Sequence, residues 1–247
     1  MAICPSSAKH VLGNCRQHAN ANPPPICLAL LSSIRLPRRY SSTKATVKNN
    51  HSGKPRYTLS KEQRDFLDSA LRVDQAGELA AVLIYQAQGP QVVRSHPHLR
   101  PLMKHMHEQE VGHFSTFNDL IAKHRVRPTA LYPVWQAAAT FLGWSTGVMG
   151  REAAMACTEA VETEIGGHYN EQVREILSWE MDAHRRGEEL DDELKNILAK
   201  FRRFRDEELE HLDHALENDS KEAKPYDPLV SLIRLGCRSA IKISERV

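Results

Sequence analysis

The stretches Glu110-Val111-Gly112-His113 and Glu208-Leu209-Glu210-His211 are the two places in this chain where a glutamate precedes a histidine by three residues. Chance alone predicts roughly one such pair in a chain of this composition, so the surroundings of the motif must carry the argument. On a helix, residues three apart share a face, and each stretch would present a carboxylate and an imidazole side by side. These two stretches decide the predicted fold.

Both pairs lie within apolar stripes of helical spacing. The positions one and two turns away from each glutamate are apolar and share its face. They are Met103, Met106, Phe114 and Phe117 around Glu110, and Phe201, Phe204, Leu212 and Ala215 around Glu208. The spacing predicts that both pairs point into a helical core. The alternative is that they are ordinary pairs on solvated faces.

A carboxylate buried in such a core costs on the order of several kcal/mol unless it is paired or bound to a cation. Arg205 is the only basic residue on either stripe. Carboxylate oxygen and imidazole nitrogen together suit iron or manganese rather than calcium, and the lack of thiolates argues against structural zinc. Cys157 and Cys237, the cysteines beyond the first sixty residues, form no Cys-x-x-Cys pair.

Two further glutamates extend the pattern to four helices. Glu78 and Glu162 each lie on an apolar helical face, and Glu159, one turn before Glu162, is its rival; spacing alone leaves that choice open. The resulting order of Glu, Glu-x-x-His, Glu, Glu-x-x-His is the ligand plan of di-iron carboxylate bundles. The sequence therefore predicts an all-α four-helix bundle with a dinuclear metal site. Its candidate ligands are Glu78, Glu110, His113, Glu162, Glu208 and His211.

The rest of the body also has helical spacing, without clear alternation of period two. Helix-start residues, glycines and prolines predict six segments, four of them long enough for a bundle. Their approximate ranges are 60–88, ending at Gly89-Pro90; 98–124; 134–167, ending at Gly166-Gly167; 169–186; 187–218; and 229–245.

Residues 128–150 carry no charge. This stretch could cross a bilayer by length, but its prolines, glycines and polar residues argue against a span. Its aromatic residues favour a helix lying at a membrane interface, with a buried bundle helix as the alternative. The candidates for contact with a membrane, or with a substrate entering from one, are Trp135, Phe141, Leu142, Trp144 and Met149.

The chain has 247 residues and a net charge of +2, but the charge is divided unevenly. Residues 1–61 hold ten of the 33 Lys and Arg residues and no acid, which leaves 23 basic against 31 acidic residues in the remainder. The acid-free start predicts a mitochondrial presequence over 1–40 and a linker over 41–58, before one folded domain over 59–247. The alternative is a basic tail that binds nucleic acid or anionic lipid.

His168 and Tyr169 form a second candidate feature. Tyr169 lies two turns after Glu162 on the same helical face. A phenol or imidazole at that place could relay protons or electrons to a metal centre, and a packing tyrosine is the alternative.

Several strings of the chain resemble those of the demethoxyubiquinone hydroxylases of ubiquinone biosynthesis. They are RVDQAGE, EQEVGH, HRVRPTALYPVW, EAAMACTEAVE, HYNEQ, FRDEELEH and GCRSAIKISER, and the similarity covers about residues 59–247. The resemblance implies a ferritin-like bundle whose non-haem di-iron centre is held by the six ligands named above, with His168 and Tyr169 near the iron. It also implies that O2 hydroxylates the benzoquinone ring of a polyprenylated precursor, with NADH as the expected reductant.

The same resemblance implies a peripheral protein on the matrix side of the mitochondrial inner membrane. We expect an oligomer that works in a ubiquinone biosynthesis complex with a lipid-binding partner, and no nucleic-acid partner. Two departures from the family's pattern concern contacts rather than ligands. Gln75 stands where histidine is expected, and Leu79-Ala80 where Tyr-Gly is expected.

Three other functions fit parts of the pattern. A ferritin-like iron-binding protein with ferroxidase activity would share the ligands but need no apolar entry surface. A non-catalytic scaffold of the ubiquinone biosynthetic complex would need no metal. A membrane quinol oxidase would share the ligand set and differ in its product.

Overall fold

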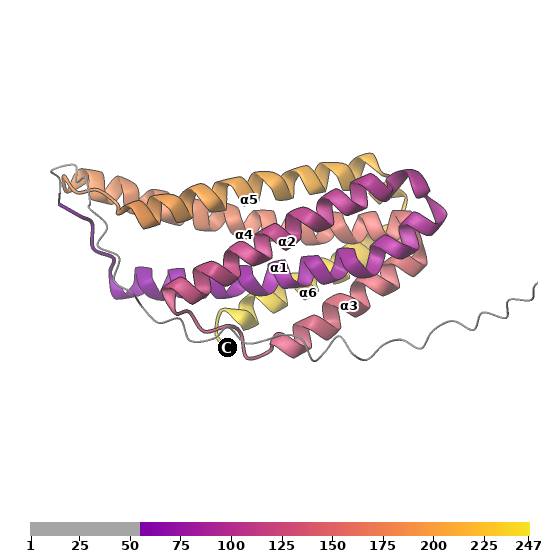
Figure 1. The fold of residues 1–247 in the computed structure, drawn as a ribbon, viewed down its shortest axis with the longest axis horizontal. Coiled ribbons are helices and arrows are strands. Elements are labelled where there is room, and N and C mark those ends of the chain that lie inside the picture. The colour runs from indigo at the N-terminus through magenta and orange to yellow at the C-terminus, as the bar shows by residue number, and fades with distance from the viewer. Residues whose placement is uncertain (1–54) are drawn as a thin grey trace, which may run out of the picture. The chain divides into compact units, whose positions relative to one another are not determined.

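The computed structural model describes residues 55–247, so the predicted presequence and most of the predicted linker lie outside the described residues. The described part is helical (Figure 1). Its helices are α1 (Lys61–Ser95), η2 (Pro97–Leu99), α2 (Arg100–His124), α3 (Tyr132–Met149), α4 (Arg151–Arg185), α5 (Asp192–Glu217), η3 (Ser220–Glu222) and α6 (Tyr226–Ser244). The prediction of an all-α chain is confirmed.

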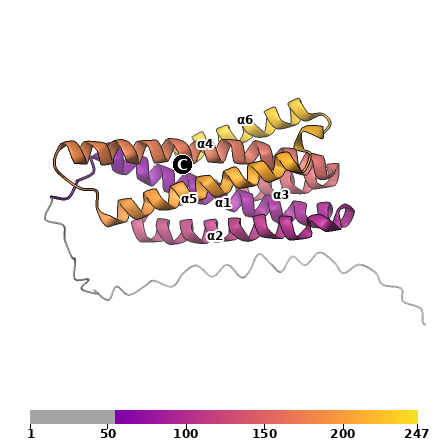
Figure 2. The same cartoon turned by 90° about the horizontal axis from the view of Figure 1, so that it is seen from above.

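Four long helices form the bundle, arranged as two packed pairs. Helix α1 packs along α2, and α4 packs along α5. The shorter helices cover the outside, α3 against α1 and α6 against α4, as the two views show (Figures 1 and 2). The backbones of α2 and α5 approach each other at few points. The two pairs approach more closely between α1 and α4, and between α2 and α5 they meet mainly through side chains.

Local chemistry fixes several helix ends. A capping box opens α1, because the Ser60 hydroxyl accepts from the Gln63 amide while the Gln63 side chain accepts from the Ser60 amide. Asp191 caps α5 by accepting a hydrogen bond from the Leu194 amide. Gly150 separates α3 from α4 with φ of 122°, a backbone conformation that residues with a Cβ rarely adopt.

Three predicted boundaries were wrong. Helix α1 continues through Pro90 to Ser95. An internal proline removes only one helical hydrogen bond, and the burial of Val92 and Val93 stabilises the helix beyond it. The predicted break at Gly166-Gly167 lies instead at Gly150. The predicted segment 134–167 is therefore divided between α3 and α4, and 169–186 continues α4. Helix α5 begins at Asp192, because Gly187 belongs to the preceding turn with φ of 71°.

Apolar side chains fill the bundle on both sides of its polar centre. One buried cluster contains Phe117, Tyr169, Phe201 and Phe204. The other contains Met103, Met106, Met155 and Ala215. Two of the predicted stripe residues, Phe114 and Leu212, are only partly buried. The polar residues of the two Glu-x-x-His stretches lie between these clusters along the helices.

The uncharged helix α3 has two different faces. Ala139, Gly143, Thr146 and Gly147 are buried, whereas Phe141, Trp144, Val148 and Met149 are exposed. Among residues 55–247, no helix combines the length and apolar character that crossing a membrane requires. One face of α3 therefore packs against the bundle, and the other is an exposed apolar surface.

The close approach of α3 to α1 predicts the effect of one substitution. A Cβ on Gly143 would lie 2.4 Å from the Ile84 carbonyl oxygen, which belongs to the backbone of α1 and cannot rotate away. We expect Gly143→Ala to lower the free energy of unfolding by about 1–3 kcal/mol, measured by chemical denaturation. Gly89→Ala is the matched control, because no atom lies within 4 Å of its added Cβ. Equal stability of the two variants would contradict the assigned packing.

Candidate metal centre

The structure brings all six predicted ligands together in the middle of the bundle. They form two groups in which the potential ligand atoms lie within 4.8 Å of one another. The first group is Glu78, Glu110, His113 and Glu208, and the second is Glu110, Glu162, Glu208 and His211. Glu110 and Glu208 belong to both groups. The arrangement therefore has room for two neighbouring cations that share two carboxylates.

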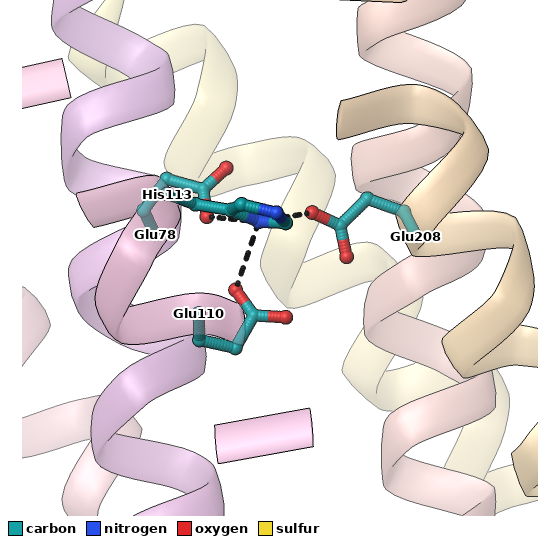
Figure 3. Close-up of side chains that lie close together, drawn as sticks. All are labelled: Glu78, Glu110, His113 and Glu208. Carbon is teal, nitrogen blue, oxygen red and sulfur yellow. Dashed lines mark ion pairs between the residues drawn. The ribbon is translucent and has the colours of Figure 1, made fainter. Parts of the chain in front are cut away.

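Figure 3 shows the first group, in which three carboxylates point at one imidazole. His113 Nδ1 lies 3.1 Å from Glu208 Oε1, 3.3 Å from Glu78 Oε2 and 3.7 Å from Glu110 Oε2. In the second group, His211 Nδ1 lies 2.9 Å from Glu110 Oε1 and 3.2 Å from Glu208 Oε2. Each imidazole therefore turns the same nitrogen, Nδ1, towards the carboxylates.

The atoms that face the centre are those left without a hydrogen bond among the described residues. All six side chains are at most 3% exposed. Buried polar atoms without a partner are costly and demand an explanation. Here they are Glu78 Oε2, both oxygens of Glu110 and of Glu208, Glu162 Oε2, and Nδ1 of His113 and of His211. Oxygen and imidazole ligands of this kind fit iron or manganese.

Charge explains why this cluster suits a cation. Burial raises the pKa of Glu78 and of Glu162 well above the usual range, and the neighbouring Glu208 and Glu110 reinforce the rise. Burial also opposes ionisation of Glu110, but His113 and His211 outweigh it and lower its pKa to about 2. Burial disfavours the charged form of His211, but Glu110 and Glu208 raise its pKa to about 11. Protons on the histidines thus balance the carboxylates, and a cation must displace them to bind.

Two residues adjacent to the ligands hold the imidazoles from behind, and the sequence analysis missed both. His113 Nε2 lies 2.6 Å from Glu207 Oε2, and His211 Nε2 lies 3.0 Å from Gln109 Oε1. Carboxylate and amide oxygens accept hydrogen bonds, so each Nε2 carries a proton, and each Nδ1 faces the centre, where a cation would displace its proton. Gln109 and Glu207 share one sequence feature, because each directly precedes the glutamate of a Glu-x-x-His motif. Each contacts the histidine of the other motif, on the other helix.

The two halves of the bundle repeat this design. The Tyr85 hydroxyl of α1 donates to Glu162 Oε1 of α4 at 2.8 Å, and the Tyr169 hydroxyl of α4 donates to Glu78 of α1. Each tyrosine follows the glutamate of its own helix by seven residues. Hydrogen bonds thus cross from α1 to α4 in both directions, as they cross between α2 and α5.

The structure separates Glu162 from its rival Glu159. Glu159 turns away from the centre and accepts hydrogen bonds from Ser220, Lys221 and Tyr226. Burial opposes its charge, but these three partners lower its pKa. Glu159 therefore fastens η3 and the start of α6 to α4.

An apolar cavity of about 520 Å³ reaches the centre from the side of α3 and α6. Glu78, His168 and Tyr169 lie in its wall near the centre. Four of the five predicted entry residues also line it: Trp135, Phe141, Leu142 and Met149. Trp144 does not, and packs instead on Phe141 with ring centroids 6.1 Å apart.

Comparison with known proteins agrees with this arrangement. The family "Ubiquinone biosynthesis protein COQ7" matches residues 65–244, a range that contains all six centre residues and the cavity wall. The chain belongs to this family. The ferritin-like fold predicted from the sequence is therefore confirmed for the described residues.

Named members of the COQ7 family are similar over most of their length. The chain is 44% identical to "5-demethoxyubiquinone hydroxylase, mitochondrial" of Saccharomyces cerevisiae over 220 residues, which are 89% of this chain and 94% of the yeast protein. It is 40% identical to human "NADPH-dependent 3-demethoxyubiquinone 3-hydroxylase, mitochondrial" over 190 residues, 77% of this chain and 82% of that one. It is 42% identical to "3-demethoxyubiquinol 3-hydroxylase" of Rhodospirillum rubrum over 181 residues, 73% and 78% of the respective chains.

The hydrogen bond behind His113 leads to a prediction about metal affinity. Glu207→Ala removes the acceptor that orients His113, and we expect roughly 10–100-fold weaker binding of Fe²⁺ or Mn²⁺ in an anaerobic titration. Asp206→Ala is the matched control, since Asp206 is exposed and bonds only to the neighbouring Arg205. Equal metal affinity of the two variants would remove Glu207 from the support of the centre.

Proposed function

We propose that the chain is an O2-dependent monooxygenase that hydroxylates the benzoquinone or quinol ring of a polyprenylated demethoxyubiquinone. The observation that carries the proposal is the pairing of a buried carboxylate and histidine centre with an apolar cavity that ends at it. The named relatives are hydroxylases of demethoxyubiquinone or its quinol, which fits a ring that would reach this cavity.

The proposed metal ligands are the six residues of the centre, which would hold two iron ions. When bound, the iron ions supply the activation of O2. The chain's own residues then bind the metals, exclude water and orient the imidazoles through Glu207 and Gln109. Tyr169, whose hydroxyl donates to Glu78, is placed to hold a proton at the cavity end of the centre. His168 lies beside it as a second candidate for proton or electron transfer.

The cavity gives the substrate a route to the centre. Its wall is mostly apolar, as a polyprenyl tail requires, and the exposed Phe141 and Met149 belong both to this wall and to the outer face of α3. We propose that this face contacts a membrane surface, from which the lipid substrate enters. The relatives named mitochondrial, together with the acid-free first sixty residues, support a mitochondrial location, and we propose a peripheral place on the matrix side of the inner membrane.

Electrons must come from outside the chain. Hydroxylation inserts one oxygen atom of O2 into a ring C–H bond and reduces the other to water with two electrons and two protons. No dinucleotide-binding Gly-x-Gly-x-x-Gly motif is present in the sequence. NADH was the reductant expected from the sequence, whereas the name of the human relative specifies NADPH. The reductant, the oligomer and the lipid-binding partner of a biosynthetic complex stay predictions.

Product analysis tests the proposed reaction. Full-length protein reconstituted with Fe²⁺ is incubated with a short-tailed demethoxyubiquinone, ¹⁸O2 and either NADH or NADPH. We expect a product heavier by one ¹⁸O atom, and loss of turnover together with metal binding in Glu208→Ala at unchanged helicity.

Each competing function has its own result in this assay. A quinol oxidase would release the oxidised quinone without added oxygen. A ferroxidase would consume O2 with Fe²⁺ alone and migrate as a large cage. A scaffold would bind less than about one iron per chain after reconstitution. Any of these results without the ¹⁸O product would overturn the proposal.

The exposed face of α3 predicts membrane binding that can be separated from folding. Phe141 and Trp144 are 66% and 50% exposed, so replacing both by serine should leave the bundle folded. We expect the double variant to bind phosphatidylcholine vesicles containing cardiolipin several-fold more weakly in a flotation assay. Met181→Ser is the control, because Met181 is 62% exposed but lies near the end of α4, away from the cavity. Equal loss in both variants would argue against a specific membrane face.

A further inference from the structure

The inner end of the cavity holds two polar side chains that the metal centre does not use. Asp74 lies one turn before Glu78 on α1, and His168 lies beside Tyr169 on α4; both line the cavity. Asp74 is 4% exposed. Neither Asp74 Oδ2 nor His168 Nε2 has a hydrogen-bond partner among the described residues.

Asp74 is held in place through its other oxygen. The Gln172 side-chain amide donates to Asp74 Oδ1 at 2.7 Å. His168 Nε2 lies 3.7 Å from the same oxygen, too far for a hydrogen bond. A purely structural role for Asp74, which links α1 to α4, would require only the hydrogen bond from Gln172. Oδ2 is therefore left over, in a residue that lines an otherwise apolar cavity.

Burial disfavours the charged form of both groups. Burial raises the pKa of Asp74 well above its usual range, with Gln172 opposing the rise, and burial lowers the pKa of His168 to about 4. A neutral carboxylic acid donates one hydrogen bond, and a neutral imidazole donates or accepts one. Such a pair suits an uncharged oxygen rather than an ion.

The internal repeat of the bundle shows that this pair is specific to the cavity side. When Glu78 is matched with Glu162 and Tyr85 with Tyr169, Gln88 falls on Gln172. In the same alignment, Asp74 corresponds to Thr158 and His168 corresponds to Ile84. The half of the centre without Asp74 and His168 therefore keeps the ligand, the tyrosine and the glutamine. Asp74 and His168 are therefore found only on the side of the centre that the cavity reaches.

We propose that Asp74 Oδ2 and His168 Nε2 form a binding subsite for a ring oxygen of the quinone head group. The subsite rests on the proposed function, and it adds the residues that fix the ring beside Glu78. Gln172 acts as a positioning residue, because it touches Asp74 and not the cavity.

Binding of an oxidised quinone tests the subsite without turnover. The probe is a decyl-tailed methoxy-methyl-benzoquinone, added to iron-loaded full-length protein with no reductant. Trp135 lines the cavity, so quenching of tryptophan fluorescence reports its occupation. The comparison ligand is a benzene with the same decyl, methoxy and methyl substituents but without the two ring oxygens.

We expect Asp74→Leu to weaken binding of the quinone about tenfold, as for loss of one hydrogen bond to a buried partner, and to leave binding of the arene within about twofold. Asp74→Asn keeps a neutral donor and an acceptor for Gln172, and should restore most of the quinone affinity. Gln75→Leu is the matched control, since Gln75 is equally buried but bonds to Asn118 and lies outside the cavity wall. It should leave the affinities for both ligands unchanged.

Two results would overturn the subsite. One is an equal loss for quinone and arene in Asp74→Leu, which would give Asp74 only a packing role. The other is a wild type that shows no preference for the quinone over the arene. A wild type that prefers the quinone through Asp74 yet forms no ¹⁸O product would instead refute the proposed reaction and leave the subsite standing.

Discussion

Four carboxylates that meet inside a helical bundle, each with at least one oxygen that has no hydrogen bond among the described residues, are the constraint on which the rest of the structure depends. Their mutual repulsion must be balanced, and only the two histidines supply positive charge among them. The balance is built into the architecture, because α1 and α4 each supply one glutamate and α2 and α5 each supply a Glu-x-x-His pair. The apolar clusters on both sides keep water away and so make the need for a cation stronger.

The bundle meets this constraint with a repeated unit. Each half supplies one helix with a glutamate and a tyrosine, and one with Glu-x-x-His preceded by a hydrogen-bond acceptor. The halves then complete each other, since every tyrosine and every acceptor contacts a ligand of the other half. The repeat differs mainly at the cavity, where Asp74 of α1 and His168 of α4 stand in place of the matching Thr158 and Ile84. The departure from symmetry thus lies on the side of the centre that faces the cavity.

The helical class and the candidate ligands could be predicted from the sequence because both follow from spacing along single helices. Helix ends were harder, since Pro90 and Gly166 have the same local character as true helix breakers and only tertiary packing keeps α1 and α4 continuous. Neither Glu207 nor Gln109 could be identified from the sequence. Their contacts join residues about a hundred positions apart, which no local pattern reveals. Glu159 was excluded only by its bonds to Ser220, Lys221 and Tyr226.

The few close approaches between α2 and α5 have a consequence for the life of the protein in a cell. The seam between these helices is bridged by the candidate ligands themselves, so a metal ion bound there would contribute directly to the free energy of unfolding. A chain that fails to acquire metal keeps its helices but has a weaker seam, which opens more often to proteases. If the proposed centre holds iron, scarcity of iron would lower the amount of the protein as well as its activity, so that abundance itself would report the metal supply.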